Sequence, residues 1–189
     1  MAGYSTTVGV TVSEEPYGRA EAAALVAGLM ADIDRRYEPE PTGGEAVVVP
    51  DARPAPQSAP PHDPAWDIDP AHVVRPHGTF VIARIGGRAV GCGALRPLPG
   101  GPCGIGEVKR MYTAPDARGR GVGRAVLDRL VVAADELGFT GLVLETGTRQ
   151  PEAAALYHRA GWHSVVPYGE YADDTLSLCF GLDLAPPVL

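Results

Sequence analysis

Lysine, cysteine and long apolar runs are scarce in this chain of 189 residues. Lys109 is its only lysine, and its three cysteines lack C-x-x-C spacing, which disfavours a disulfide framework and a zinc site. The five histidines show no metal-ligand spacing, so no metal is expected. No stretch approaches the ~20 apolar residues of a membrane span, and the N-terminus lacks a basic segment followed by an apolar one. We therefore expect a cytoplasmic protein without a membrane partner.

Positive charge is also in short supply, since the formal net charge is −7 at pH 7. This bulk charge disfavours a nucleic-acid partner, because such proteins usually present a basic surface to the phosphates. A hydrophobic content of 45% supports a folded chain with a sizeable core. We expect one domain over residues 1–189.

Periodicity predicts strands and helices in the order β, α, long loop, β, β, β, α, β, α, β, β. The expected strands span 6–13, 78–85, 88–95, 106–113, 140–145, 162–166 and 175–184, and the helices 19–36, 124–137 and 151–159. This order predicts a mixed α/β fold in which helices flank a central, mostly antiparallel sheet of about six to seven strands.

Residues 38–78 have a different composition, since nine of the chain's 19 prolines lie between Pro39 and Pro70. Proline excludes a long helix here and allows at most short strands or turns. Composition leaves open whether this Pro-rich insertion is ordered and whether it forms part of a binding site.

A glycine- and arginine-rich loop, Arg118-Gly-Arg-Gly-Val-Gly123, lies between an expected strand and an expected helix. Its glycines let the backbone approach a ligand, and the helix that follows directs free N–H groups at an anion. The sequence of this loop fits neither the G-x-G-x-x-G dinucleotide motif nor the Walker loop. A pyrophosphate is the expected ligand, and a surface turn without a ligand is the alternative.

The pattern Arg118-x-x-Gly121-x-Gly123 resembles the Q/R-x-x-G-x-G/A signature of the GNAT superfamily of acyl-CoA N-acyltransferases. A second block, from Gln150 to Trp162, is similar to that family's N-x-x-A-x-x-L-Y-x-x-x-G-F helix. The two blocks follow in the family's order, and the resemblance covers about residues 79–184. The chain departs from it with Gln for Asn at 150 and Trp for Phe at 162. The first departure puts a cofactor contact in doubt.

The resemblance implies a GNAT fold in which two central strands splay apart, and acetyl-CoA as the co-substrate. The cofactor contacts that it implies are Met111, Tyr112, Thr113, Arg118, Gly119, Arg120, Gly121, Val122, Gly123, Arg124 and Gln150. It also implies an oxyanion donor at the backbone N–H near Met111. Strict alternation along the strand places Glu107 and Met111 on one face, and a bulge would change that assignment.

Acyl transfer to an amine needs a base for the ammonium proton and an acid for the departing thiolate. The resemblance implies that Tyr157 is the acid, whereas a packed core tyrosine is the alternative. Glu107 is a carboxylate in a buried-looking strand, which suits a base acting directly or through water. A salt bridge to Lys109 or to an arginine, or simple exposure near the strand end, is the alternative.

The leading function is an N-acetyltransferase that acts on a primary amine of a small or amino-acid-like molecule. The late loop could line the acceptor site through Tyr168, Glu170, Tyr171, Asp173 and Asp174, with an ordinary polar connection as the alternative. Glu145 reads as a strand-end charge near the cleft. Acetylation of a protein amine and a non-catalytic acyl-CoA-binding module remain alternatives, because fold-level resemblance fixes the donor better than the acceptor. Homodimerisation is common in the superfamily and stays open.

Overall fold

One mixed sheet organises the chain. The structure is a computed structural model that describes residues 9–38 and 68–184. In these ranges seven strands pair in the order β1-β2-β3-β4-β5-β7-β6. They are β1 (Thr11–Glu14), β2 (Thr79–Ile85), β3 (Arg88–Pro97), β4 (Ile105–Thr113), β5 (Gly141–Gly147), β6 (His163–Val165) and β7 (Ser177–Asp183). Only the β4–β5 pair is parallel, so the predicted mixed, mostly antiparallel fold is confirmed.

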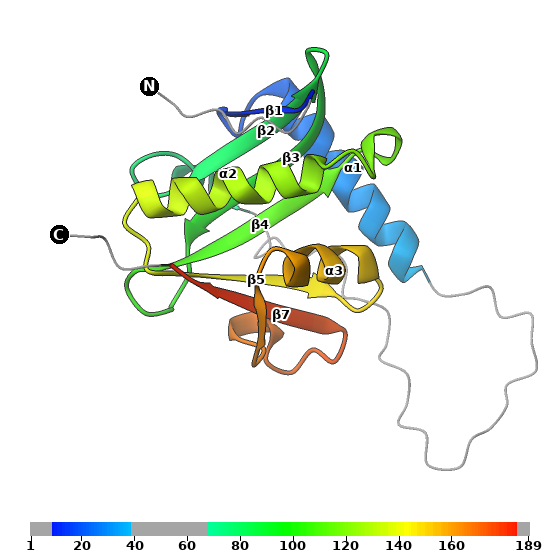
Figure 1. Cartoon of the computed structure of the whole chain (residues 1–189). Helices are drawn as coiled ribbons and strands as arrows, with labels where there is room; N and C mark the ends of the chain where they lie inside the picture. The colour runs from blue at the N-terminus through cyan, green and yellow to red at the C-terminus, as the bar shows by residue number, and fades with distance from the viewer. Residues whose placement is uncertain (1–8, 39–67, 185–189) are drawn as a thin grey trace, which may run out of the picture.

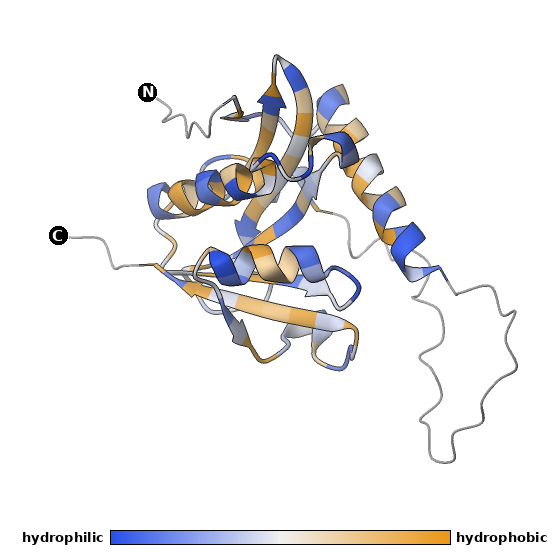
Figure 2. Cartoon of the chain, turned by 45° about the vertical axis from the view of Figure 1, so that its right-hand side comes forward, coloured by the Kyte–Doolittle hydropathy of each residue, from blue (hydrophilic) through white to orange (hydrophobic). Residues whose placement is uncertain are grey.

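Helices cover both faces of this sheet (Figure 1). They are α1 (Ala20–Tyr37), α2 (Val122–Glu136) and α3 (Pro151–Arg159), with short 3-10 helices η2 (Pro70–Val73), η3 (Pro115–Ala117) and η4 (Gly169–Tyr171). Helices α2 and α3 bury apolar residues on one face, and α1 does so on the other. Figure 2 shows the resulting pattern, with apolar strands inside and helices that alternate between polar and apolar residues. No helix within the described ranges is long and apolar enough to cross a membrane.

Strand β3 brings α2 unusually close to the sheet. A Cβ atom on Gly91 would meet the Val122 side chain at 2.6 Å, and one on Gly93 would meet Val126 at 2.7 Å. Because neither glycine carries a side chain, α2 packs directly on the strand backbone. This contact fixes the start of α2, and with it the glycine- and arginine-rich loop, against the centre of the sheet.

Strands β4 and β5 separate after four paired residues. Their parallel pairing ends at Val108 and Leu144, whereas β3 follows β4 to Thr113 and β7 follows β5 to Gly147. The last five residues of β4 and the last three of β5 therefore have no partner in each other. The predicted splay is confirmed, and it opens a gap in the middle of the sheet.

A bulge in β4 overturns the predicted side-chain alternation. The register between β3 and β4 shifts between Cys92 and Ala94, and Arg110 has φ of 57°. Met111 consequently packs with Val108 in the cluster under α2, not on the face of Glu107. A β-bulge places two residues opposite one, which reverses the face of every side chain beyond it.

The predicted elements agree with the structure to within a few residues at each end. The turn between β2 and β3 uses a glycine pair, with φ of 56° at Gly86 and 81° at Gly87. Cys92 is buried, and burial raises its pKa to about 12. Residues 6–8 of the first predicted strand and 39–67 of the Pro-rich insertion lie outside the described residues.

Candidate active site

A cavity of about 240 Å³ lies where β4 and β5 diverge. Its walls come from α1, the ends of both strands, the start of α3, and the segment from η4 to β7. They are formed by Leu29, Met30, Ile33, Asp34, Tyr37, Val108, Lys109, Arg110, Met111, Glu145, Thr146, Gly147, Gln150, Tyr157, Tyr171, Asp174, Leu176 and Ser177. Apolar side chains of α1 and charged side chains of the strands thus meet in one space.

The glycine- and arginine-rich loop, residues 118–123, leads into α2. Gly119 and Gly121 adopt left-handed φ values of 73° and 79°, and Gly121 is the N-cap of the helix. The backbone hydrogen bonds of α2 begin at Ala125, whose N–H donates to Gly121 O at 3.0 Å. No backbone hydrogen bond is found among the described residues for the N–H groups between Arg118 and Ala125. The first amides of a helix have no intrahelical acceptor. Their N–H groups are therefore available to an anion.

The arginines of this loop differ in how they are engaged. The Arg118 guanidinium donates to Asp32 Oδ2 at 2.9 Å and to Thr113 O at 3.3 Å. Arg124 pairs with Asp128 one turn further along α2, at 2.8 Å. Arg120 is exposed. The side chain of Arg118 thus already has an anionic partner from α1.

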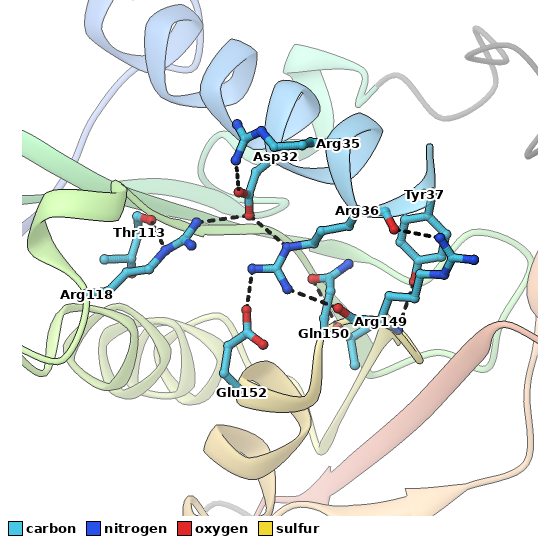
Figure 3. A network of polar contacts seen from close by, with 10 residues as sticks. Asp32, Arg35, Arg36, Tyr37, Thr113, Arg118, Arg149, Gln150 and Glu152 are labelled. Carbon is cyan, nitrogen blue, oxygen red and sulfur yellow. Dashed lines mark hydrogen bonds and ion pairs between the residues drawn. The ribbon is translucent and has the colours of Figure 1, made fainter. Parts of the chain in front are cut away.

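Asp32 is the centre of a charge network that joins α1 to the loop and to α3 (Figure 3). Its carboxylate accepts from Arg118, from Arg36 at 3.1 Å and from Arg35 at 3.2 Å. Arg36 also pairs with Glu152 in the first turn of α3. Burial acts to raise the pKa of Asp32, but the arginines outweigh it and hold that pKa below its usual value. Asp32 therefore stays ionised.

Glu107 is almost fully buried, at 1% exposure, and its carboxylate is engaged in hydrogen bonds and ion pairs. Its Oε2 accepts from Arg96 Nε at 2.8 Å and from Arg96 Nη2 at 2.7 Å. Its Oε1 accepts from the Tyr168 hydroxyl at 3.2 Å and lies 3.9 Å from Lys109 Nζ. Glu107 does not line the cavity. Of the two interpretations of this residue, the geometry favours the ion pair.

Lys109 carries positive charge on the cavity wall, as does Arg110 beside it. Its ammonium donates to the Tyr171 hydroxyl and lies 5.0 Å from the centre of that ring. Burial lowers the pKa of Lys109, while Glu107 and Glu145 oppose that shift. Lys109 thus links β4 to the late loop, to which Tyr171 belongs.

Glu145 is the carboxylate of β5 that faces the cavity. Its Oε1 accepts from the Ser177 hydroxyl at 2.8 Å. Burial raises the pKa of Glu145 above its usual value, and the hydrogen bond from Ser177 and the charge of Lys109 only partly offset this. A raised pKa brings a carboxyl closer to the range in which it can act as a general base or acid.

Tyr157 faces the same cavity from α3. It is 4% exposed, and its ring lies 5.5 Å from Phe180 and 6.1 Å from Trp162. Burial raises the pKa of its phenol, so the hydroxyl keeps its proton. None of the hydrogen bonds among the described residues involves this hydroxyl, which leaves it able to donate into the cavity.

The remaining predicted contacts divide between the cavity and its surroundings. Met111 and Gln150 line the cavity, and Gln150 is the N-cap residue of α3. The Tyr112 side chain instead lies against Gly28 of α1. In the late loop, Tyr171 and Asp174 line the cavity, as the acceptor-site reading expects.

Several cavity residues have no signal in the sequence. The sequence predicts Lys109 only as a salt-bridge partner, although it is the only lysine of the chain. Ser177, Asp34 and Tyr37 carry no motif, and they reach the cavity only through the packing of α1 and the pairing of β5 with β7. Asp32 likewise lies in an ordinary helical pattern. Long-range packing, which a single sequence does not display, brings these residues together.

Comparisons with known proteins agree with this geometry. A family model described as "Acetyltransferase (GNAT) family" matches residues 46–162. An IAA acetyltransferase of Azospirillum brasilense is 41% identical over 111 residues, 59% of this chain and 71% of that protein. An uncharacterized N-acetyltransferase of Schizosaccharomyces pombe is 36% identical over 94 residues, 49% of this chain and 56% of that protein. A protein of Klebsiella pneumoniae whose solved structure bears the provisional name acyl-CoA N-acyltransferase superposes with a TM-score of 0.66 at 26% identity, over 98% of this chain and 100% of that one.

Proposed function

This chain belongs to the acetyltransferase (GNAT) family and is an acetyl-CoA-dependent acyltransferase, and we propose that its acceptor is a primary amine of a small, amino-acid-like molecule. The amine attacks directly while both substrates are bound. The observation that carries this proposal is the cavity at the β4–β5 divergence, because it brings a proton donor, carboxylates and an ammonium together in one small space.

The glycine- and arginine-rich loop fits the anionic end of acetyl-CoA. Left-handed glycines at 119 and 121 expose the backbone, and the N-terminus of α2 adds the positive end of a helix dipole. Arg118 and Arg120 supply charge-assisted hydrogen bonds beside it. In this proposal the loop holds the pyrophosphate, while the unpaired edges of β4 around Met111 and Thr113 hold the pantetheine amides.

Acetyl-CoA supplies a thioester, whose sulfur leaves as a thiolate unless it receives a proton. Tyr157 suits the role of proton donor because its hydroxyl is protonated, faces the cavity and has no other partner among the described residues. Donation to a leaving group in the transition state typically contributes 10²–10⁴-fold, so about that range is at stake here.

The cavity also supports a small acceptor over a protein amine. Its volume of about 240 Å³ suits a small molecule, and small-molecule sites are characteristically concave and mostly apolar with a few polar groups. Three carboxylates, those of Asp34, Glu145 and Asp174, can attract a cationic amine, while Lys109 can meet a carboxylate. The A. brasilense relative is named for IAA, which makes IAA a useful member of a substrate panel.

A thiol-release assay tests the proposal. Acetyl-CoA is offered with amino acids, polyamines, aminoglycosides and IAA, and CoA binding is measured in parallel by calorimetry. We expect one class of amine to provoke release, and Tyr157→Phe to reduce it by about 10²-fold while CoA binding persists. Tyr17→Phe is the matched control, since Tyr17 packs against Phe80 outside the cavity.

The outcomes separate the alternatives. Binding of CoA without release for any amine would point to a non-catalytic acyl-CoA-binding module. Release that is insensitive to small amines but stimulated by a protein substrate would point to a protein acceptor. Equal activity of wild type and Tyr157→Phe would remove Tyr157 from the mechanism and leave the transferase reading intact.

A further inference from the structure

Ser177 lies between two carboxyl groups. Its Oγ is 2.8 Å from Glu145 Oε1 and 2.8 Å from Asp174 Oδ2. A hydroxyl has one hydrogen, and an ionised carboxylate can only accept. Both contacts are hydrogen bonds only if one carboxyl group carries a proton and donates it. The three residues are therefore arranged to share a proton.

The fold sets this arrangement rather than chance side-chain contact. Ser177 begins β7 opposite Gly147, two residues beyond Glu145 on the neighbouring strand. Asp174 is held by the turn before β7, because its Oδ1 accepts from Leu176 N at 2.8 Å and its carbonyl accepts from Ser177 N at 3.2 Å. Both carboxyl groups are thus fixed near the same end of one strand pair.

The three groups also differ in their access to water. Glu145 is partly buried, Ser177 is 8% exposed and Asp174 is exposed, and all three line the cavity. A proton that enters at Glu145 consequently has a hydrogen-bonded route through Ser177 to an exposed carboxylate.

We propose that Glu145 takes the proton from the acceptor amine and that Ser177 and Asp174 pass it to solvent. This proposal rests on the proposed acetyltransfer. The N–H bond of the ammonium breaks as an O–H bond forms on Glu145. Ser177 Oγ then accepts that proton while its own hydrogen moves to Asp174, and Asp174 releases it to water. Glu145 is a catalytic residue, while Ser177 and Asp174 are positioning residues that act through it.

Other groups around Glu145 set the pH at which it works. Burial raises its pKa, as do the negative charges of Asp174 and Glu107, whereas Ser177 and Lys109 lower it. The further titratable groups that line the cavity or interact with Glu145 are Asp34, Tyr37, Arg110, Tyr157, Tyr171 and Cys179. Because a base must be ionised, we expect the rate to rise with pH as Glu145 loses its proton.

The experiment is the pH dependence of thiol release with acetyl-CoA and the panel amine that gives the fastest release. The ionisation of the amine is common to all variants, so differences between variants report on the protein. Glu145→Gln should lower the rate at neutral pH by about 10²-fold or more and abolish the acidic limb. Glu107→Gln should keep that limb and move it to lower pH, because a charge that raises the pKa of Glu145 is lost.

The positioning residues give opposite shifts. Ser177→Ala removes a hydrogen bond that favours ionised Glu145, so the limb should move to higher pH. Asp174→Asn removes a negative charge, so the limb should move to lower pH. Asp183→Asn, at the exposed far end of β7, is the matched control that moves nothing.

Two failures are distinguishable. If wild type releases no thiol with any amine, the acetyltransfer itself fails, and the base assignment falls with it. If wild type is active but Glu145→Gln keeps the acidic limb, only the base assignment is overturned. Identical limbs in wild type, Ser177→Ala and Asp174→Asn would overturn the relay. Carbon-detected NMR titration of Glu145 in the free protein gives the same shifts independently of turnover.

Discussion

Single charged side chains at the cavity form two layers, a lower one that is buried and an upper one on the cavity wall. Arg96 and Glu107 form a buried ion pair, with side chains 9% and 2% exposed. Lys109 and Glu145 lie above this pair on the cavity wall. In the lower layer Glu107 lies 3.9 Å from Lys109 Nζ, and in the upper layer Lys109 and Glu145 face the cavity. A carboxylate that is tied to an arginine cannot easily serve as the base as well.

Breaking the lower ion pair from one side should be costly. Arg96→Leu leaves Glu107 buried with Lys109 as its nearest cation at 3.9 Å, and an uncompensated buried charge costs about 3 kcal/mol or more. The double variant Arg96→Leu with Glu107→Leu should lose less, because apolar side chains replace both charges. Urea denaturation of the four proteins in this cycle measures the coupling. Additive losses would contradict a buried pair.

The sequence identifies these site residues unevenly, for physical reasons. Tyr157 and Gln150 follow from a motif whose local spacing survives in the structure, and Met111 follows from the strand position that the resemblance implies. All three line the cavity. The sequence narrows the partner of Glu107 only to Lys109 or an arginine. The actual partner, Arg96, lies opposite Glu107 on the neighbouring strand β3. Ser177 is recognisable only from the β5–β7 register.

At the scale of elements, the sequence predicts the helices and strands well because their periods are local. The predicted helix 19–36 is observed at 20–37, and 151–159 is observed unchanged. The face of Met111 is wrong because a bulge depends on the neighbouring strand and not on the sequence of β4 alone. The 3-10 helices η2, η3 and η4 also escaped the prediction, since they carry no periodic pattern.

Helix α1 controls the charge of the glycine- and arginine-rich loop through Asp32. In the structure Arg118 donates to Asp32, so an anion at the loop must compete with a carboxylate for it. Asp32→Asn should therefore tighten CoA binding by roughly fivefold, about 1 kcal/mol, while it lowers the free energy of unfolding. Calorimetric titration with CoA measures the first effect and urea denaturation the second.

A variant at the other end of α1 provides the control. Glu21→Gln removes a carboxylate that pairs with Arg84 and not with an arginine of the loop. This variant should leave CoA affinity unchanged. Weaker CoA binding in Asp32→Asn would mean that Asp32 holds Arg118 in its binding position and does not compete for it.

At the scale of the whole molecule, the sheet divides into two halves that share only four pairs of residues between β4 and β5. One half is closed by α2 and the other by α3, on the same face. The candidate cavity lies at their divergence, so residues from six separate elements meet there. This is why sequence motifs locate the site but do not enumerate it.

A second charge network stabilises the first of these halves. Glu14, at the end of β1, accepts from Arg75 at 2.9 Å and 2.7 Å and from the buried Arg129 of α2. Arg75 and Arg129 both also contact Glu136 near the end of α2. Glu14 thereby ties β1, the segment before β2, and α2 together.

Removing Glu14 tests this network. Hydrogen bonds from Arg75 lower the pKa of Glu14 below its usual 4.5, and the charge of Arg129 adds to this against the effect of burial. A carboxylate with a lowered pKa stabilises the fold above pH 4.5, and that stabilisation is lost as the pH falls through the folded-state pKa. Glu14→Gln should therefore cost about 2 kcal/mol at pH 7, and the difference from wild type should close in acid. Denaturant unfolding measured at neutral and acidic pH checks both parts.

Glu136→Gln is the control for this prediction. The side chain of Glu136 is 39% exposed, so its loss should cost only about 0.5 kcal/mol. If the loss of stability in Glu14→Gln persisted unchanged into acid, packing and not charge would hold these elements together.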